Sequence, residues 1–524
     1  MNTAHRSWIN DVTRNASLEQ LRTRKVDVAV IGGGITGAGV ALDAISRGLS
    51  VALIESDDFG SGTSGFSSKL VHGGLRYLAK ADVALAWESA VERRRLMETI
   101  APHLIHPLGF IIPDTSTAKR TQTIAAAAGV LIYDVLRCAT GLSGSILPRP
   151  QLLSRQAVAA MVPALDTATL RGGVLYWDGQ IIDDARLVLS VLRTAAGLGA
   201  HVLRDVQATS LTDTSVHATD RRTGADLEIR AGVVVNATGV WAADFEEDLD
   251  LVPSRGTHLV VRAERLGNPH AAHTVAVPGH FGRFVFVLPQ PDSVVYIGLT
   301  DEEDRDADGH RPTVPEHDVD FLLEVLNQVL AVPLTREDVL GTFAGLRPLV
   351  RTKHPKTAAP SAEISRHHLV HDVPGKPITV VGGKLTTYRA MAQDAVDAAA
   401  ARIGATARSR TTKIALVGAA PRSVLEKIDA PARLVTKYGT EAADVHRLAG
   451  EHPLLSAPLY AGTQITGAEL LFGLRAEGAT SLEDLLERRT RIGLVPEDAA
   501  KARNRAGEIL GMFDHCSATE RYGS

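Results

Sequence analysis

Three glycines near the start of the chain have the spacing that a bound dinucleotide requires. Gly32, Gly34 and Gly37 form a G-x-G-x-x-G pattern directly after an apolar segment at residues 26–31. The first glycine allows a tight turn, the second lets a pyrophosphate approach the backbone, and the third permits close packing of a helix on a strand. The pattern predicts a phosphate site at a helix N-terminus, where amide groups and the helix dipole favour anions.

An acidic residue follows at the distance expected for contact with a ribose. Glu55 lies 18 residues after Gly37, close to the spacing of about 20 in dinucleotide-binding folds. Its carboxylate would accept hydrogen bonds from the adenosine ribose, and it would repel a 2′-phosphate. The two features together predict FAD or NAD and argue against NADP.

Further polar donors favour FAD over NAD. Residues 59–74 read FGSGTSGFSSKLVHGG, a stretch rich in glycine and serine. Two later apolar segments, 233–239 and 378–383, also end in glycine. An NAD-binding fold would continue with regular β-α units, whereas this chain returns to the sheet after long excursions. We therefore expect a long cofactor across the carboxyl ends of the strands.

The elements that must position these residues begin with a β-α-β unit. Its strands are expected at 26–31 and 49–55, and its helix at 39–47. A helix is expected at 81–100, and another at 183–196 with Asp183 and Asp184 as its cap.

The middle and end of the chain have different patterns. Antiparallel strands are expected at 259–261, 284–288 and 294–299, with a turn at Pro291 and Asp292 between the last two. From about residue 409 the chain reads as helical, with capping boxes expected at Thr466-x-x-Glu469 and Ser481-x-x-Asp484.

These patterns predict a mixed fold, α/β plus α+β, in three domains. The first is a Rossmann-like FAD-binding domain with a parallel sheet, the second an antiparallel-sheet substrate or cap domain, and the third a helical domain. The boundaries are expected at 24–80, 176–250 and 375–405 for the first domain, 81–175 and 251–374 for the second, and 406–524 for the third.

Composition sets limits on partners and compartment. The 524 residues carry a formal net charge of −4, which gives no sign of a nucleic-acid partner. The two cysteines form no C-x-x-C pair, so no zinc or dithiol site is expected. The first 25 residues have no apolar core of a secretion signal. We expect a cytoplasmic protein or one attached to a membrane face.

The apolar run at residues 124–133 bears on the membrane question. Its ten residues are too few for a span, which needs about 20. With Lys119, Arg120 and Arg137 around it, the run could form an interfacial helix. A buried core helix is an equally good interpretation.

Several segments together resemble a known family. They are IGGGITGAGVALDAISRGLSVALIE, SSKLVHGGLRYL, WDGQIIDDARLVL, VVNATGVWA, GTHLVV, GLRPL and GGKLTTYR. The chain resembles the quinone-linked, FAD-dependent glycerol-3-phosphate dehydrogenase family, within the D-amino-acid-oxidase-like flavoproteins. The resemblance implies oxidation of sn-glycerol 3-phosphate to dihydroxyacetone phosphate, with hydride transfer to flavin N5 and electrons passed to a membrane quinone. It also implies a homodimer, peripheral on the inner face of the cell membrane.

The resemblance also assigns the substrate site. His258, Arg347 and Lys384 match catalytic positions, and Arg76, Tyr77 and Arg366 join them in substrate binding. Arginine forks suit a phosphate dianion. A neutral imidazole suits removal of the hydroxyl proton, so we favour His258 over Arg347 as the base because arginine stays protonated. The sequence leaves that choice open.

The implied FAD contacts extend over the glycine-rich segments and the strand ends. They are Gly32, Gly34, Ile35, Thr36, Gly37, Glu55, Thr63, Ser64, Ser67, Ser68, Lys69, Leu70, His72, Gly73, Gly74, Val206, Ala237, Thr238, Gly239, Trp241, Gly383, Lys384, Leu385 and Thr386. The helix beginning near Leu385 is expected to stabilise negative charge on reduced flavin.

Three alternative functions stay open at this stage. An oxidase would deliver electrons to oxygen, but the chain lacks the extra insertion common in such members. An amine-oxidising flavoenzyme would share the fold without needing phosphate-binding arginines. A non-catalytic FAD-binding protein would not need the set of His258, Arg347 and Lys384.

Overall fold

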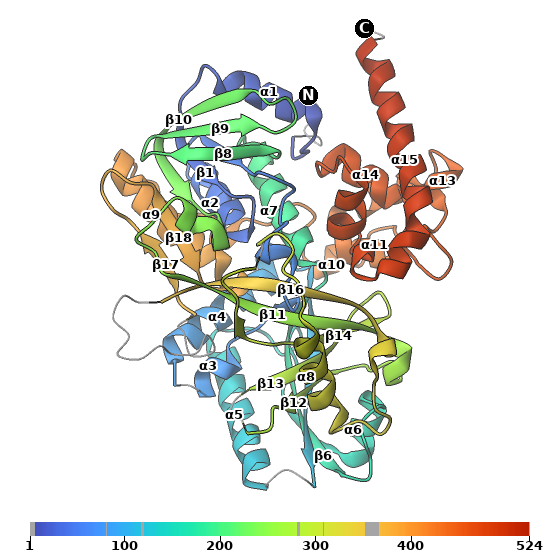
Figure 1. Ribbon diagram of the computed structural model, residues 1–524. Helices are drawn as coiled ribbons and strands as arrows, with labels where there is room; N and C mark the ends of the chain where they lie inside the picture. The colour runs from blue at the N-terminus through green and yellow to red at the C-terminus, as the bar shows by residue number, and fades with distance from the viewer. Residues whose placement is uncertain are drawn as a thin grey trace.

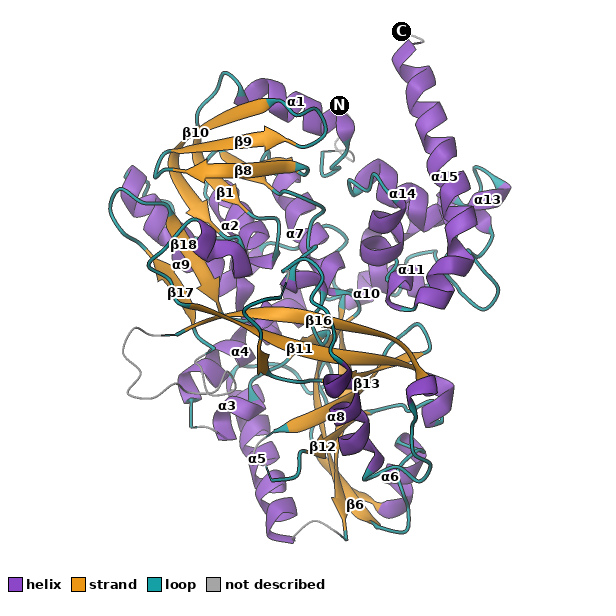
Figure 2. Ribbon diagram, in the orientation of Figure 1, coloured by secondary structure: helices purple, strands orange, loops and turns teal. Residues whose placement is uncertain are grey.

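Two β-sheet lobes and a helical domain make up the molecule. The computed structural model describes residues 6–79, 81–116, 120–279, 283–307, 309–351 and 366–522. In Figure 1 the lobes lie one above the other, and the helical domain lies beside the upper one. The colouring in Figure 2 shows strands in both lobes and almost none in the third part. The predicted fold class, α/β plus α+β with a helical end, is confirmed.

The upper lobe is built on a mainly parallel sheet. Its strands run in the order β17 (His368–His371), β18 (Ile378–Gly382), β10 (Asp226–Asn236), β1 (Val26–Ile31), β2 (Val51–Ile54) and β7 (His201–Leu203), with β9 (Ser215–Asp220) and β8 (Val206–Leu211) added to β10. β1 pairs in parallel with both β10 and β2. Short apolar strands of this kind are expected where both faces of a sheet are covered.

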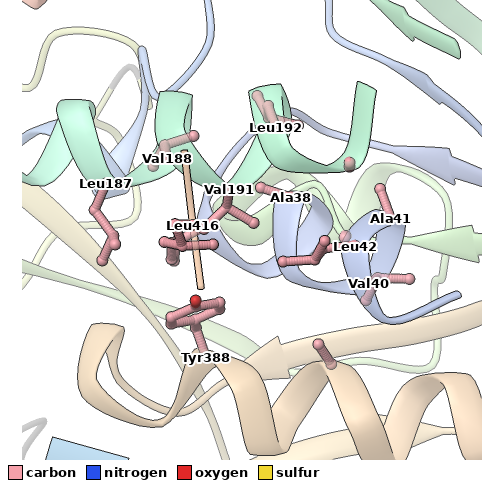
Figure 3. Close-up of a cluster of buried hydrophobic side chains, with 14 of the residues drawn as sticks. Ala38, Val40, Ala41, Leu42, Leu187, Val188, Val191, Leu192, Tyr388 and Leu416 are labelled. Atoms are coloured by element: carbon pink, nitrogen blue, oxygen red, sulfur yellow. The ribbon is translucent and has the colours of Figure 1, made fainter. Parts of the chain in front are cut away.

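Three helices cover one face of this sheet. They are α2 (Ile35–Ser46), α7 (Asp184–Gly197) and α9 (Tyr388–Ile403). Figure 3 shows Leu42 of α2, Val191 of α7 and the Tyr388 ring of α9 converging on one cluster around Leu416. α7 begins where predicted, and the Asp183 side chain caps it as predicted, whereas α2 begins at Ile35 rather than at residue 39.

The opposite face is covered by α1 (Asp11–Leu21) and the β8–β9 hairpin. Leu21 packs there with Ala29 and Ile31 of β1 and with Val216 of β9. The parallel sheet is therefore buried on both faces, and this packing holds its strand ends in place.

The lower lobe contains a larger, mostly antiparallel sheet. Its strands run in the order β15 (Glu302–Glu303), β11 (Leu251–Arg262), β14 (Val294–Gly298), β13 (Phe284–Pro289), β12 (Ala272–Ala276), β4 (Ile105–Thr115), β6 (Leu170–Ile181) and β3 (Leu70–Val71), with β16 (Val339–Val350) on β11 and β5 (Gln151–Ser154) on β6. The antiparallel strands predicted after residue 253 are confirmed, as is the turn between β13 and β14. The long strands β4 and β6 were not predicted.

Helices surround the lower sheet. They are α3 (Leu75–Ala79), α4 (Val83–Arg95), α5 (Arg120–Ala139), α6 (Arg155–Met161) and α8 (Glu316–Asn327). The helix predicted at 81–100 is α4 followed by a π-helical turn, Leu96–Ile100. Among the described residues, no helix combines the length and the apolar character that crossing a membrane would require.

The end of the chain is helical, as predicted. It comprises α10 (Arg422–Leu425), α11 (Ala432–Tyr438), α12 (Ala442–Leu448), α13 (Pro453–Ser456), α14 (Gly467–Ala476) and α15 (Pro496–Tyr522). Both predicted capping boxes form, the first with Thr466 and Glu469 and the second with Ser481 and Asp484.

Two short strands cross the predicted domain boundaries. β3 lies within the predicted FAD-binding segment 24–80 but pairs with β6 in the lower sheet. β17 lies within the predicted substrate segment 251–374 but forms an edge of the upper sheet. The chain therefore passes between the lobes at these points, which brings the cofactor segment against the lower sheet.

Candidate active site

A large cavity of about 1830 Å³ lies where the two lobes meet. Its walls include the carboxyl ends of β1, β2, β10 and β18 and the facing strands of the lower sheet. Open α/β sheets bind ligands outside the carboxyl ends of their strands. The cavity is thus the place where the predicted site residues should meet.

Most predicted cofactor residues line this cavity. They are Gly32, Gly34, Ile35, Thr36, Glu55, Thr63, Ser64, Ser67, Ser68, Leu70, His72, Val206, Ala237, Thr238, Gly239, Trp241, Gly383, Lys384, Leu385 and Thr386. Gly37, Lys69, Gly73 and Gly74 lie behind the wall and do not line it. For these four residues, the predicted direct contact with the cofactor is not supported by the cavity wall.

The glycine pattern forms a tight turn between β1 and α2. Gly32 has a φ of +107°, and a Cβ there would lie 2.6 Å from the carbonyl oxygen of Ala237. A Cβ on Gly37 would overlap the carbonyl oxygen of Gly32. The turn places the N-terminus of α2, capped by Gly34, at the cavity wall. An anion in the cavity would meet the amide end of that helix.

Glu55 lies at the end of β2, beside this turn. Its carboxylate accepts hydrogen bonds from the backbone amides of Gly33 at 2.6 Å and Asp57 at 2.9 Å. Burial raises the pKa of Glu55, although these hydrogen bonds oppose the shift. An acceptor held at this position fits the hydroxyl groups of a ribose.

These features fit a dinucleotide with two phosphates. One wall of the cavity contains three such features: glycines at which an added Cβ would clash, a helix N-terminus, and an acidic residue at the end of the next strand. Thr63 and Ser64 add hydroxyl groups to the same wall, and Ser64 Oγ already accepts the Ile35 amide at 2.9 Å. The residues present would therefore hold the FAD that the sequence predicts.

His258 lies in the lower lobe, inside β11. Its Nε2 is 2.8 Å from Ser68 Oγ, and its ring stacks on Phe343 of β16 with a centroid distance of 4.7 Å. Gly298 is its register partner on β14, and a Cβ there would lie 2.9 Å from the imidazole Nε2. The absence of a side chain at Gly298 is what makes room for the ring.

Burial keeps this imidazole neutral. Desolvation, with the nearby cations Arg347 and Lys69, lowers the pKa of His258 to about 3. A neutral ring can accept a proton at one nitrogen, as general base catalysis requires. An anionic substrate beside Arg347 would offset part of that cation's effect and raise the basicity of the ring.

Two arginines meet at one carboxylate near His258. Arg347 Nη1 lies 3.4 Å from Asp301 Oδ1, and Arg366 Nη2 lies 2.7 Å from Asp301 Oδ2. Ser254 Oγ also donates to Asp301, at 2.6 Å. Arg347 lies inside β16. Both guanidinium groups face the cavity, so either could bind a phosphate there through two parallel hydrogen bonds.

Lys384 supplies a third cation. Its Nζ donates to Ser89 Oγ at 2.5 Å and lies 4.2 Å from the Tyr77 ring centroid. Burial lowers the pKa of Lys384 to about 8, and Arg366 adds to the effect. The structure thus brings Tyr77, Arg366 and Lys384 to one region, whereas the Arg76 side chain lies outside the described part of the chain.

Lys384 also precedes the predicted cofactor-facing helix end. Leu385–Thr387 form a 3₁₀ turn that continues into α9. Leu385 and Thr386 line the cavity. The first turn of the predicted helix is therefore tighter than an α-helix, but it still directs its amide end toward the cavity.

Several important residues were not assigned a role from the sequence. Asp301, which links the two arginines, follows β14 without any motif around it. Ser89 lies within α4, and Phe343 within β16, so their contacts arise from tertiary packing. Sequence pattern carries no signal for such contacts between distant segments.

The far end of the cavity is apolar. Phe110, Ile112, Phe284 and Phe286 line it from the lower sheet. Helix α5 contributes further small and apolar residues at positions 125, 126, 128, 129 and 132. The cavity thus joins a polar, cationic region to an apolar one.

Comparisons with known proteins agree with this geometry. Residues 27–389 match the family described as FAD dependent oxidoreductase, and residues 409–519 match the C-terminal domain of alpha-glycerophosphate oxidase. Glycerol-3-phosphate dehydrogenase 1 of Mycobacterium tuberculosis is 44% identical over 518 residues, which cover 97% of this chain and 99% of that protein. The human mitochondrial glycerol-3-phosphate dehydrogenase is 33% identical over 95% of this chain and 72% of that protein.

Solved structures show the same similarity. A glycerol-3-phosphate dehydrogenase from Bacillus halodurans, complexed with FAD, superposes with a TM-score of 0.72 at 27% identity, over 95% of this chain and 93% of that one. The L-alpha-glycerophosphate oxidase of Mycoplasma pneumoniae shares the fold, with a TM-score of 0.54 at 17% identity, over 75% of this chain and 99% of that one.

Proposed function

Since the chain belongs to the family of FAD-dependent glycerol-3-phosphate dehydrogenases, we propose a role for each polar group in its cavity and an acceptor for its electrons. The reaction is the oxidation of sn-glycerol 3-phosphate to dihydroxyacetone phosphate, with FAD as cofactor. The observation that carries the assignment of roles is the meeting of His258, Arg347 and Lys384 in one cavity beside the glycine turn. The division into FAD-binding, substrate and helical domains is part of the same proposal.

The cationic region holds the substrate phosphate. Lys384, Arg347 and Arg366 place three positive groups around one part of the cavity. Asp301 pairs with both arginines. A phosphate dianion would compete with Asp301 for their donors, and it would gain charge-assisted hydrogen bonds in exchange.

His258 receives the proton of the C2 hydroxyl. Its neutral ring presents Nε2 toward Ser68 and the cavity. Substrate hydroxyl would replace the Ser68 hydroxyl as the partner of that nitrogen. Arg347, which stays charged, would stabilise the alkoxide character that develops as the proton leaves. FAD, when bound, accepts the hydride from C2.

We further propose that the electrons leave to a quinone at a membrane surface. The apolar end of the cavity reaches Ile132 of α5. Ile124, Leu131, Ile132 and Val135 of that helix are 59–68% exposed, and their spacing places them on one face. Such a face suits the inner membrane surface, where a lipid-soluble quinone could reach the cavity. A homodimer, which the family resemblance implies, is also part of the proposal.

One correction concerns the charges around this helix. Of the two interpretations of this segment, the interfacial one would have Arg137 flank it in solvent, but Arg137 is 4% exposed and bonds to Asp134 and to the Leu142 carbonyl. Val130 and Tyr133 are buried on the same side. Lys119 lies outside the described residues. The helix therefore combines a core face with an exposed apolar face.

The decisive experiment adds sn-glycerol 3-phosphate to the purified yellow protein without oxygen. Rapid loss of the flavin absorbance is expected, with glycerol and D-amino acids inert. The His258→Asn variant should keep its FAD but reduce it about 10²–10⁴ times more slowly, the usual range for loss of a general base. Equal rates in the variant and the wild type would exclude His258 as the base and favour Arg347.

A second measurement identifies the acceptor. Reduced protein mixed with a short-chain quinone should reoxidise faster than protein mixed with dissolved oxygen. Rapid formation of hydrogen peroxide in air would instead indicate an oxidase.

A further inference from the structure

Arg491, which follows α14 in the helical C-terminal domain, reaches the wall of the active site. The residue is 9% exposed. Its guanidinium donates to the carbonyl oxygen of Gly65 and lies 3.8 Å from the Asp184 carboxylate. It also lies 5.6 Å from the ring centroid of Phe66. Gly65 and Phe66 belong to the glycine-rich segment that lines the cofactor cavity, so a distant domain contacts this segment directly.

Asp184 links Arg491 to the catalytic histidine through the segment from Ser67 to Lys69. One of its oxygens accepts both the Ser67 amide at 2.8 Å and the Ser67 hydroxyl at 2.7 Å. The other accepts the Lys69 ammonium at 2.6 Å. Ser68 lies between these two residues, and its hydroxyl bonds to His258 Nε2. One buried carboxylate thus fixes the neighbours on both sides of Ser68.

The backbone of this cluster is held in an uncommon conformation. Lys69 has a φ of +58° and Arg491 a φ of +63°. Residues other than glycine occupy this left-handed region at a cost, and such positions gather at functional sites where the surroundings enforce them. At Lys69 the turn directs the side chain inward to Asp184 while the adjacent Ser68 lines the cavity.

The charges in the cluster balance one another. Lys69 is 1% exposed, so its cation needs a buried anion. Asp184 supplies that anion, and its two neighbours Arg491 and Asp183 add one charge of each sign. Removing the Arg491 guanidinium would leave the Gly65 carbonyl without this donor and would alter the field at Asp184.

We propose that Arg491 is a positioning residue for the reaction, holding the segment from Gly65 to Lys69 so that Ser68 and His258 keep their place against the cofactor. The inference rests on the proposed role of His258. It gives the C-terminal domain a function in catalysis through the shape of the cofactor site.

The backbone at position 491 offers a sharp test. Glycine adopts the left-handed conformation without strain, so Arg491→Gly removes the guanidinium while favouring the native turn. Asn268 has a φ of +55° and is exposed in a remote turn, which makes Asn268→Gly the matched control. Arg491→Lys keeps the charge but loses the planar fork.

Two measurements on the full-length holoprotein decide the question. In Arg491→Gly, the rate constant of flavin reduction at saturating sn-glycerol 3-phosphate should fall about 100-fold, because a small misplacement of reacting groups costs that much. The substrate dissociation constant should change little. Arg491→Lys should recover part of the rate. Hydrogen exchange of peptides from residues 60–74 should speed up in Arg491→Gly and stay unchanged in Asn268→Gly.

The outcomes separate this inference from the proposed function. Unchanged reduction and unchanged exchange in Arg491→Gly would overturn the role of Arg491. If that variant does not fold, wild-type behaviour of Arg491→Lys in both measurements would overturn it. If the wild-type protein holds FAD that the substrate does not reduce, the proposed function fails, and the exchange measurement still decides whether Arg491 positions the segment.

Discussion

At the scale of single residues, the cavity depends on charges whose state is set by burial. His258 and Lys384 both have a lowered pKa, and desolvation is the largest cause for each. The consequences differ, because a neutral imidazole is the form that accepts a proton whereas a neutral lysine no longer attracts phosphate. Burial therefore prepares His258 for its proposed role and limits the pH range of Lys384.

This difference predicts an alkaline limb in the pH profile. Lys384 is charged below its pKa of about 8, and the cation is lost as the pH rises through that value. Glu88 and Asp82 oppose the shift and Arg366 adds to it. The value of kcat/KM, which reports the free enzyme, should fall above pH 8 through a rising KM.

The Lys384→Arg variant provides the check. Arginine stays protonated throughout this range, so the alkaline limb should move to higher pH even where the variant is slower overall. The same limb in Lys384→Arg and wild type would assign it to another group.

At the scale of elements, register decides where the functional side chains meet. His258 on β11 faces Gly298 on β14 and Phe343 on β16. A methyl group at Gly298 would lie 2.9 Å from two atoms of the imidazole. The Gly298→Ala variant should displace the ring and slow flavin reduction about 100-fold.

Stability and FAD content distinguish displacement from unfolding in this variant. Overpacking of this kind costs about 1–3 kcal/mol, so the protein should still fold and retain its yellow colour. Gly507→Ala on α15 has no neighbour within 4 Å of the added Cβ and serves as the control. Normal reduction by Gly298→Ala would show that the ring does not need its present position.

Sequence pattern predicted the elements whose signal is local. Strand β1, the glycine turn and the cap of α7 by Asp183 follow from hydrophobic periodicity and from residue types at fixed spacing. The strands β4 and β6 were missed because glycines and prolines interrupt their alternation of apolar and polar residues. Their extended structure depends on their pairing with each other. The helix predicted at 81–100 ends in a π turn, which the sequence pattern did not indicate.

The residues of the candidate site also fall into those that the sequence identified and those that only the structure shows. The cavity brings together His258, Arg347 and Lys384, which the family resemblance identified. Asp301 and Arg491 act through contacts between segments distant in the chain, and no local spacing predicts such contacts. The residue roles themselves stay predictions until the variants are measured.

At the scale of the whole molecule, buried ion pairs join the helical domain to the upper lobe. Asp58, 1% exposed, binds Arg489 at 2.7 and 2.9 Å and Arg204 at 3.2 Å. Arg204 also binds Asp484 at 2.7 Å. Burial would raise the pKa of Asp58, but the guanidinium groups more than offset it, so the pKa lies below its usual range.

The lowered pKa predicts that the domains separate in acid. A carboxylate with a depressed pKa stabilises the fold above its ordinary value of 3.8, and the contribution is lost as the pH falls below that value. FAD release and loss of helix contacts should therefore begin below about pH 4 in an acid titration. Asp58→Asn should cost about 3–5 kcal/mol at neutral pH, since it leaves Arg489 buried without its partner charge.

The stability of Asp58→Asn should also depend less on pH in the acid range, because the variant has no carboxylate to protonate at this position. Glu441→Gln, which affects a more exposed pair with Arg193, is the comparison. If both variants lost the same stability, the buried network would have no special role in joining the domains.

The exposed apolar face of α5 is a feature that packing among the described residues leaves unexplained. Leu131 and Val135 are 63% and 67% exposed, and they lie beside Ile132, which lines the cavity. Because burying apolar area gains about 25 cal/mol per Å², a charge in this face should weaken attachment to lipid. Leu131→Glu and Val135→Glu should remain in solution when wild-type protein sediments with phosphatidylglycerol-containing vesicles. Leu152→Glu changes a 79% exposed leucine on β5 and should still sediment.

Reduction of FAD by substrate should be unchanged in all three variants, whereas electron transfer to a vesicle-bound quinone should slow in the two α5 variants. Equal sedimentation of all the variants would place the membrane contact elsewhere on the molecule.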